Sequence, residues 1–310
     1  MDGKLWDRLY REVRRACKGL ARSRRVGRPP VYGTDEVLMV WAFAALNDWP
    51  ISTTHDKLKR GTVGWWMRRH WFWPLPLPSV PTLTRRARAT DFRWLLRRVL
   101  RRLRRFLGLA PTSHVAMDAT LLLTGAWSRD PESRWTCHNG KWFRGYALHA
   151  ICDRSGVLWA WHVTSASVQE MKAARRLIRQ LAAVAPGRVE IVLGDPGYDS
   201  EPLHGLVRRR LSAQLVAPIN RRGGKNEDWR ERQPGRNAAD RVLQTREGKR
   251  LMAERTVIEQ WNGWFKGTSH VSMLPYHVRR LRRVRLWVNL KLAVFFVHQL
   301  LRRKRLSVAA

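Results

Sequence analysis

The spacing of hydrophobic positions changes along the chain near residue 110. Before that point apolar residues recur three and four positions apart, so residues 4–24 carry a basic amphipathic pattern and residues 37–46 are almost entirely apolar. Thr34 followed by two acids is typical of a helix start. Gly27-Arg28-Pro29-Pro30 separates the two segments. We therefore predict an all-helical domain over residues 1–108, with a helix-turn-helix-like arrangement as one candidate.

Short apolar runs replace the helical pattern from residue 114 onward. The predicted strands cover residues 114–118, 146–152, 157–163, 189–193 and 213–217. The predicted helices cover residues 168–184, 201–210, 249–265 and 278–305. Strands followed by alternating helices and strands indicate an α/β architecture over residues 109–310.

The most apolar stretch of the chain, residues 286–301, is predicted to be a buried helix. It is short for a membrane span and contains Asn289, Lys291 and His298. The N-terminal segment has charges of both signs and no apolar core typical of a signal peptide. We expect a cytoplasmic, nucleoid-associated protein without a membrane partner.

The charge balance indicates a polyanionic partner. The chain has 60 Lys and Arg against 24 Asp and Glu, a formal net charge of +36. Nucleic acid is the first candidate and an anionic membrane surface the second. Residues 83–107 read as one helix with an apolar stripe, ten arginines and a single acid, Asp91. The arginines expected to contact DNA phosphates are Arg97, Arg98, Arg101, Arg102 and Arg105.

Cysteine and tryptophan usage narrows the chemistry further. Three cysteines without a CxxC pair indicate a reducing compartment and argue against a zinc site. Most of the 17 tryptophans are expected in the core, although one exposed ring near a cut site would be able to stack on a flipped base.

Acidic residues are scarce, so three of them attract attention. Asp118 and Asp195 end predicted strands, where open α/β sheets place their sites, and Glu259 lies in a late helix. Arg255 and Lys266 are spaced to share a face with Glu259. Each has a simpler interpretation, because an Asp at a strand end often caps a turn and Arg255 with Glu259 fits an ordinary helix ion pair. Beside a polyanion, three converging carboxylates would instead bind divalent cations.

Four segments together resemble a bacterial insertion-sequence transposase of the DDE class, more narrowly of the insertion-sequence four/five type. They are Met117-Asp118-Ala119-Thr120, residues 141–149, residues 194–200, and Arg255-x3-Glu259-x6-Lys266. They occur in the family's order and the resemblance covers nearly the whole chain.

The resemblance implies a ribonuclease-H-like catalytic domain, with a mixed sheet flanked by helices, after the N-terminal helical domain. Asp118 on the first strand, Asp195 after the fourth and Glu259 on a late helix would be the catalytic residues and would bind two Mg²⁺ or Mn²⁺ ions. Arg255 and Lys266 would hold DNA phosphates beside them. The implied activity is binding of double-stranded element ends, cleavage, and joining of the 3′-OH ends to target DNA by a homodimer, without a nucleotide cofactor.

Departures from the family pattern leave alternatives open. Met252 stands where relatives often have Tyr, Gln169-Glu170 stands where many have His-Asp, and the 64 positions from Asp195 to Glu259 leave no room for a large β-rich insertion. A catalytically silent DNA-binding protein derived from a transposase is the main alternative. A stand-alone metal-dependent nuclease would share the catalytic core, and a structural basic protein would explain the charge without the ordered acids.

Overall fold

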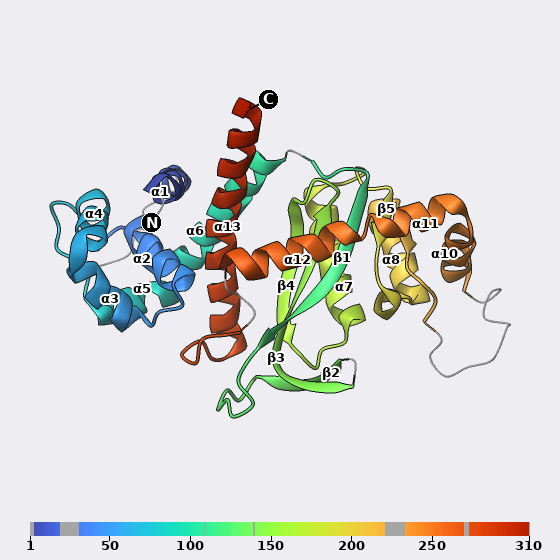
Figure 1. The fold of residues 1–310 in the computed structure, drawn as a ribbon, viewed down its shortest axis with the longest axis horizontal. Coiled ribbons are helices and arrows are strands. Elements are labelled where there is room, and N and C mark those ends of the chain that lie inside the picture. Colours follow the sequence, from blue (N-terminus) through green and yellow to red (C-terminus); the bar gives the residue numbers. More distant parts are fainter. Residues whose placement is uncertain are drawn as a thin grey trace. The chain divides into compact units, whose positions relative to one another are not determined.

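The computed structural model describes residues 3–18, 31–108, 110–138, 140–220, 233–269 and 273–309. The predicted break at residues 27–30 lies outside them. The chain forms two compact units, one made of Met1–Leu107 with Arg282–Ala310 and the other of Gly108–Leu281. Figure 1 shows a helical unit and a unit built around a sheet, and each is described by itself.

The helical unit contains most of the N-terminal third of the chain. Its helices are α1 (Gly3–Cys17), α2 (Thr34–Leu46), α3 (Ile51–Lys59), α4 (Gly61–Trp71), α5 (Val80–Arg88), α6 (Thr90–Leu107) and α13 (Leu281–Ala309). Helix α1 buries the stripe Leu5, Leu9 and Val13, whereas α2 buries residues on most of its faces. The amphipathic and apolar patterns predicted for these two segments are confirmed as helices.

The arginine-rich segment is two helices and not the single helix predicted for residues 83–107. The chain leaves helical geometry at Ala89, which has an extended backbone (φ −66°, ψ 154°) between α5 and α6. On α6, Leu95, Val99 and Leu103 are buried. The remaining face of α6 carries the arginines. The local pattern therefore predicted the basic face correctly, but it did not predict the interruption at Ala89.

Helix α13 packs with the N-terminal helices, although we expected it in the catalytic domain. Residues Leu281–Arg303 are long and apolar enough to cross a membrane by length and composition alone, yet 72% of the apolar window is buried inside the protein, as in the core helix of a globular fold. The fully buried Lys291 places its Nζ 2.7 Å from Asp48 Oδ1, and Arg303 donates to the Leu107 carbonyl. An all-round apolar helix needs helical neighbours on several sides, which the helical unit supplies.

The second unit is built on a mixed sheet. Its strands are β1 (His114–Leu123), β2 (Arg134–His138), β3 (Lys141–Asp153), β4 (Leu158–Ser165), β5 (Ile191–Leu193) and β6 (Gln214–Val216). Strand β3 pairs antiparallel with both β1 and β4, whereas β5 pairs parallel with both β1 and β6. The order β4-β3-β1-β5-β6 is ribonuclease-H-like, which confirms the expected fold class.

Strand β2 was not predicted. It pairs with the first part of β3 as a two-stranded ribbon, with Arg134 opposite Gly145 and His138 opposite Lys141. Four of its five residues are exposed. Because neither face is buried, the segment has no hydrophobic alternation to reveal it.

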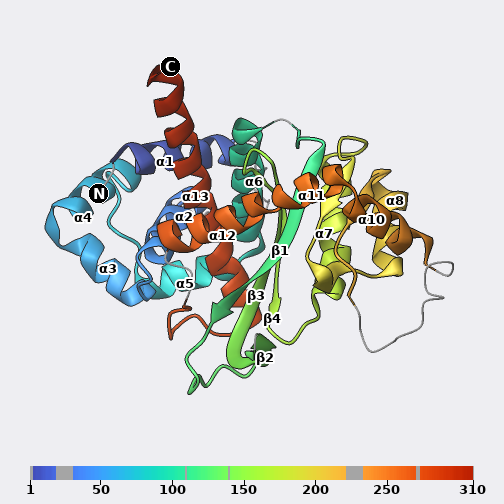
Figure 2. The same ribbon diagram turned by 45° about the vertical axis from the view of Figure 1, so that its right-hand side comes forward.

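The helices of this unit are α7 (Glu170–Val184), α8 (Glu201–Leu211), α10 (Pro234–Gln244), α11 (Arg246–Ala253) and α12 (Thr256–Ser269), with a short 3₁₀ helix η1 (Pro196–Tyr198) after β5. Helices α7, α8, α10 and α12 pack against the sheet, and α11 packs on α10. Helix α7 packs on β3 and β4, and α12 crosses β1 and β3 (Figures 1 and 2).

The late helix predicted over residues 249–265 is interrupted between α11 and α12. Glu254 sits at the interruption, where its Oε2 lies 2.8 Å from His114 Nδ1 and 3.3 Å from Arg154 Nε. These contacts anchor the start of α12 beside the start of β1. The boundary between α11 and α12 thus coincides with a tertiary contact that the sequence pattern did not reveal.

Candidate active site

The pairing of β1 with β5 brings Asp118 and Asp195 side by side. His114, Val115 and Ala116 pair in parallel with Ile191, Val192 and Leu193. Asp118 follows Ala116 by two positions, and Asp195 follows Leu193 by two. The pairing ends at Ala116 and Leu193, so each acid lies two positions beyond the last pair, at the carboxyl end of β5. The two carboxylates interact there, because the charge of Asp195 raises the pKa of Asp118.

Asp195 also caps the turn that follows it. Its Oδ1 accepts a 2.8 Å hydrogen bond from the backbone N–H of Gly197, at the start of η1. The capping role considered for a strand-end Asp is therefore real. It fixes the direction of the carboxylate toward η1 while the residue stays partly exposed.

Helix α12 presents a polar face to β1. Asn262 Nδ2 donates a 2.9 Å hydrogen bond to Asp118 Oδ2, and Asn262 is buried. Lys266 lies four positions further along the same helix, and burial lowers the pKa of its ammonium while the charge of Asp118 raises it. The helix thus brings one neutral donor and one cation to the first aspartate.

The surroundings of Asp118 disfavour its charged form. Burial raises the pKa of the Asp118 carboxyl, and the charges of Asp195 and Glu259 raise it further, against the lowering effects of the Ala119 N–H and Arg255. All three predicted acids therefore share one electrostatic neighbourhood.

Glu259 forms an ion pair with Arg255, which was the simpler of the two interpretations of the sequence. Arg255 Nη2 donates to Glu259 Oε1 at 2.6 Å, and the Glu259 side chain is 51% exposed. Arg255 stands just before α12, at the interruption after α11, so it is not on the same continuous helix as Lys266. The predicted common face holds for Glu259, Asn262 and Lys266.

The three carboxylates do not form a ready-made cage for a cation. Within the described ranges, no group of three or more His, Cys, Asp or Glu side chains is arranged to hold a metal ion. The donor chemistry nevertheless fits a hard divalent cation, because the neighbourhood is rich in carboxylate oxygens. Asn262 Oδ1 adds a buried oxygen without a hydrogen-bond partner in the part of the chain that the structure describes.

Comparison with known proteins decides the family. The chain matches the family model "Transposase DDE domain" over residues 109–296, which is more than half its length. The chain belongs to the DDE transposase family. No curated protein matches the chain. The match covers the whole sheet unit and the first half of α13, and the narrower insertion-sequence four/five type stays a prediction.

A fourth carboxylate of the transposase lies beside this group, and sequence reasoning did not assign it a role. A Cβ placed on Gly197 would come within 2.2 Å of Glu170 Oε2 and 3.0 Å of Asp195 Oδ1. Glu170, in the first turn of α7, therefore borders the same turn as Asp195. The departure at Gln169-Glu170 from the family pattern was the available signal.

Tyr198 completes the inner wall of the site. Its ring is fully buried, and its hydroxyl has no hydrogen-bond partner among the described residues. Burial raises the pKa of Tyr198 well above its usual value, and the carboxylates of Glu170, Asp118 and Asp195 raise it further. The phenol therefore stays protonated next to three acids.

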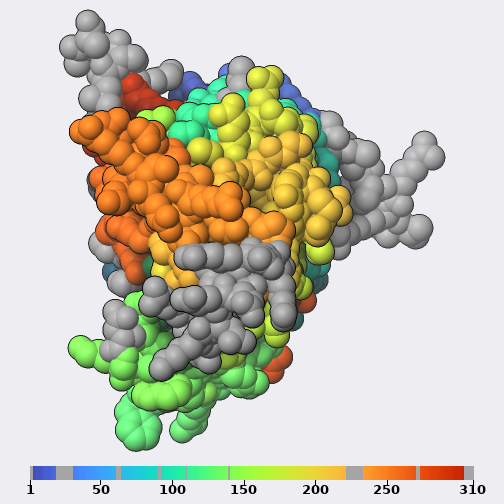
Figure 3. Space-filling model, turned by 90° about the vertical axis from the view of Figure 1, so that its right-hand side faces the viewer, coloured from blue at the N-terminus to red at the C-terminus, as the bar shows by residue number. Residues whose placement is uncertain are grey.

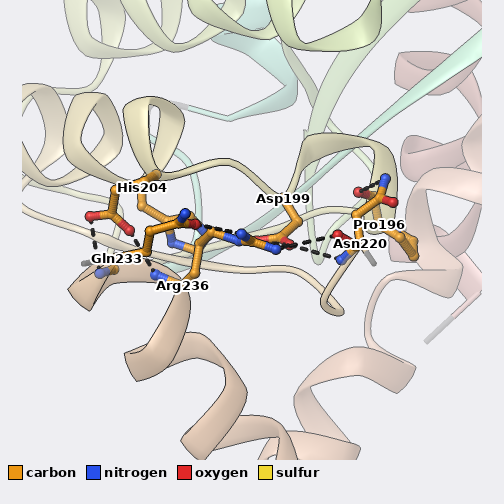
Figure 4. A network of polar contacts seen from close by, with 8 residues as sticks. Pro196, Asp199, His204, Asn220, Gln233 and Arg236 are labelled. Carbon is orange, nitrogen blue, oxygen red and sulfur yellow. Dashed lines mark hydrogen bonds and ion pairs between the residues drawn. The ribbon is translucent and has the colours of Figure 1, made fainter. Parts of the chain in front are cut away.

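A buried polar network holds the turn after Asp195 (Figure 4). Asp199 accepts from Arg236 Nη2 at 2.6 Å and from the Asn220 N–H at 2.8 Å. Asn220 Nδ2 in turn donates to the Pro196 carbonyl at 2.9 Å. Hydrogen bonds from His204, Arg236 and Asn220 lower the pKa of the Asp199 carboxyl, although burial acts first in the opposite direction. This network ties α10 to the segment that carries Asp195.

The arginines predicted to bind DNA belong to the helical unit. Arg97, Arg101 and Arg105 are exposed on α6. Arg102 pairs with the buried Glu12 at 3.2 Å, and Arg98 donates to the Lys18 carbonyl at 3.1 Å. Two of the five thus have structural partners in α1 or just after it.

Proposed function

We propose that this transposase binds the ends of an insertion sequence, cleaves a phosphodiester bond there and joins the freed 3′-OH to target DNA. The observation that carries the proposal is the parallel register that sets Asp118 beside Asp195, with Asn262 and Lys266 of α12 against Asp118. The net charge of +36 supplies the attraction to DNA.

Asp118, Asp195 and Glu259 are the residues that would hold divalent ions, with Mg²⁺ or Mn²⁺ as candidates. Bound there, such ions supply activation of the attacking oxygen and stabilisation of the leaving one. For Glu259 to take part, its ion pair with Arg255 has to loosen or be shared.

The remaining residues act on the DNA and on the acids. Arg255 presents a fork of donors suited to a phosphate, and Lys266 a point charge close to Asp118. Asn262 holds the Asp118 carboxylate by its hydrogen bond. Asp195 is held by the Gly197 N–H, which limits its motion. The exposed Arg97, Arg101 and Arg105 would contact phosphates further along, and a homodimer would pair the two ends.

The test compares cleavage with binding on a labelled DNA that carries an element end. Asp118→Asn and Asp195→Asn should reduce Mg²⁺- or Mn²⁺-dependent cleavage by more than about 100-fold, a loss of about 2.7 kcal/mol or more in transition-state stabilisation. Gel-shift affinity should change less than about threefold, because phosphate contacts dominate binding. Glu190→Gln, an exposed acid beside β5, is the matched control and should cleave normally.

A catalytically silent DNA-binding protein is the second candidate. The ion pair between Glu259 and Arg255 is the observation that favours it, since the pair occupies a carboxylate the chemistry requires. A parent protein that binds element ends but never cuts them with Mg²⁺ or Mn²⁺ would establish this alternative. In an active transposase, EDTA should stop cleavage and leave binding in place. The silent protein should bind equally well with and without EDTA and cleave in neither condition.

A further inference from the structure

The tryptophans are not mostly in the core, contrary to expectation. Of the sixteen described, five are buried and six are exposed. Three of the exposed rings cluster in one short stretch: Trp127 is 97% exposed, Trp142 68% and Trp135 46%. Large exposed apolar side chains gathered in one place indicate a binding surface.

The ribbon formed by β2 and β3 sets two of these rings on one face. Trp135 pairs with Arg144 and Cys137 with Trp142. Directly paired residues share a face of a sheet, and so do residues two positions apart on one strand. Trp135 and Trp142 are therefore diagonal neighbours on the same face, close enough for two indole rings to form a continuous surface. Figure 3 shows the green segment that contains this ribbon at the lower edge of the molecule.

Hydrogen bonds from β3 and from residues 280–281 hold the loop that carries Trp127, residues 124–133. Buried Asp130 accepts from the Tyr146 hydroxyl at 2.6 Å and from the Arg280 N–H at 3.0 Å. Glu132 accepts from the Leu281 N–H at 2.8 Å. Asp130 is buried, whereas Glu132 stays exposed while it accepts this bond.

The cations of the same segment face outward. Arg129, Arg134 and Lys141 are exposed, and the half-buried Arg144 donates to the Ala126 and Asp130 carbonyls. Side chains alternate along a strand, so Arg134 and Lys141 lie on the opposite face of the ribbon from Trp135 and Trp142. The segment therefore combines exposed aromatic rings with an excess of positive charge on the other face of the ribbon and in the adjoining loop. A second copy of the same basic surface would be repelled, so like-with-like association is disfavoured.

We propose that this aromatic ribbon, defined by Trp127, Trp135 and Trp142 with Arg129, Arg134 and Lys141, binds unpaired DNA by stacking its indole rings on exposed bases. Unpaired bases offer free π faces beside a phosphate backbone, which is the combination that matches exposed rings with cations nearby. Intact duplex keeps its bases stacked on one another and offers no such faces. The inference rests on the proposed function, in which strand cleavage leaves DNA with unpaired nucleotides.

The ribbon lies at a distance from the candidate catalytic acids. Asp118 pairs with Ala150, and Lys141 at the ribbon end is nine positions from Ala150 on the same strand. At about 3.3 Å per residue the separation along β3 is roughly 30 Å. The ribbon would therefore hold a strand well away from the cut, and not the nucleotide being cut.

The experiment measures binding of the full-length parent and of Trp127→Ala/Trp142→Ala to a labelled 20-nucleotide oligothymidine and to a 20-base-pair duplex. We expect the double variant to lose roughly tenfold or more in affinity for the single strand, because each stacked base contributes substantially. Duplex affinity should stay within about twofold. Trp65→Ala is the matched control, since that exposed ring already lies under the guanidinium of Arg69 at 5.3 Å.

A second readout separates stacking from a general loss of fold or charge. The fluorescence of 2-aminopurine placed within the oligonucleotide should fall on binding to the parent and not to the double variant. Trp127→Phe/Trp142→Phe should restore most of the quenching, because a phenyl ring still stacks. Unchanged single-strand affinity in the alanine variant, or equal losses on single strand and duplex, would overturn the proposal. A parent that never cleaves but shows the selective loss would retain the ribbon and refute the cleavage function.

Discussion

The side-chain amide of Asn262 donates a hydrogen bond of 2.9 Å to the carboxylate of Asp118, a residue 144 positions earlier in the chain. This contact joins α12 to β1. It also sets the rotation of α12 about its axis, because Glu259 and Lys266 lie within one turn of Asn262 on either side. One hydrogen bond between helix and strand therefore positions the third acid and the lysine of the transposase.

Changes at Asn262 should impair cleavage in a graded way. Asn262→Ala removes the donor and should lower the cleavage rate at least about tenfold, because a hydrogen bond to a charged group contributes about 1.5–3 kcal/mol. Asn262→Asp adds a like charge beside Asp118 and should lower the rate about 100-fold or more. Gln260→Ala, an exposed neighbour on α12, is the control. Single-turnover cleavage rates decide the matter, and a fully active Asn262→Asp would show that the contact has no part in the chemistry.

A side chain at Gly197 should lower the cleavage rate and have little effect on the free energy of unfolding. The added methyl group of Gly197→Ala would displace the Glu170 carboxylate and press on Asp195 Oδ1. The displaced group is the end of a flexible side chain, so the free energy of unfolding should fall by less than about 1 kcal/mol. Cleavage should fall at least about tenfold.

Gly263→Ala supplies the comparison for that measurement. Its Cβ meets nothing within 4 Å, and alanine favours an exposed helix by about 1 kcal/mol over glycine. This variant should melt at a slightly higher temperature and cleave normally. Equal activity of both alanine variants would remove Glu170 and the Gly197 turn from the account of the site.

Loss of the Asp199–Arg236 pair should destabilise the sheet unit. The Asp199 side chain is fully buried and that of Arg236 is 14% exposed, so Arg236→Ala leaves a buried carboxylate without its main partner. We expect a loss of about 3 kcal/mol in the free energy of unfolding, measured by chemical denaturation. Arg208→Ala, an exposed arginine on nearby α8, should change it by less than about 0.5 kcal/mol. Similar midpoints for the two variants would contradict the proposed anchoring of the Asp195 turn by α10.

Acidification should destabilise the transposase through His149. Burial lowers the pKa of His149 to about 4, and its Nε2 lies 2.9 Å from Thr164 Oγ1. In the unfolded chain the imidazole of His149 is protonated below about pH 6.5, whereas in the folded chain it stays neutral down to about pH 4. The free energy of unfolding therefore decreases as the pH falls from about 6.5 to about 4. The contribution lost over that window is about 3 kcal/mol, and it is fully present above pH 6.5.

The variant His149→Gln should show a shallower pH dependence of the unfolding free energy between pH 4 and 6.5. The parent and the variant should differ least in slope above pH 7, where the imidazole is neutral in both states. Parallel curves across the whole range would mean that His149 is already charged in the folded protein.

The amino-acid sequence by itself determined the elements that have a strong local period. Helices α1 and α7 each bury one stripe at helical spacing, whereas α2 and strands β1, β3 and β4 contain runs of consecutive buried residues. Both kinds of pattern are visible in the sequence, so they located these elements. The order of these elements was sufficient to predict the α/β unit. The position of Asp195 just after a strand also followed from local pattern, because this acid follows an apolar run. The predicted strand end at Asp118 was wrong: β1 runs from His114 to Leu123, so Asp118 lies in the middle of the strand, where tertiary pairing with β3 extends it.

Tertiary structure decided what depends on distant partners. The ribbon strand β2 has no buried face, so no alternation marks it. At the interruption before α12, Glu254 contacts His114, a partner 140 positions away that local pattern does not reveal. The pairing of Glu259 with Arg255 was one of two open interpretations. Asn262, Glu170 and Tyr198 reach the aspartates only after the sheet, α7 and α12 have packed together. Local spacing carries information about which face of an element is apolar, whereas the identity of the group facing it is set by packing across the fold.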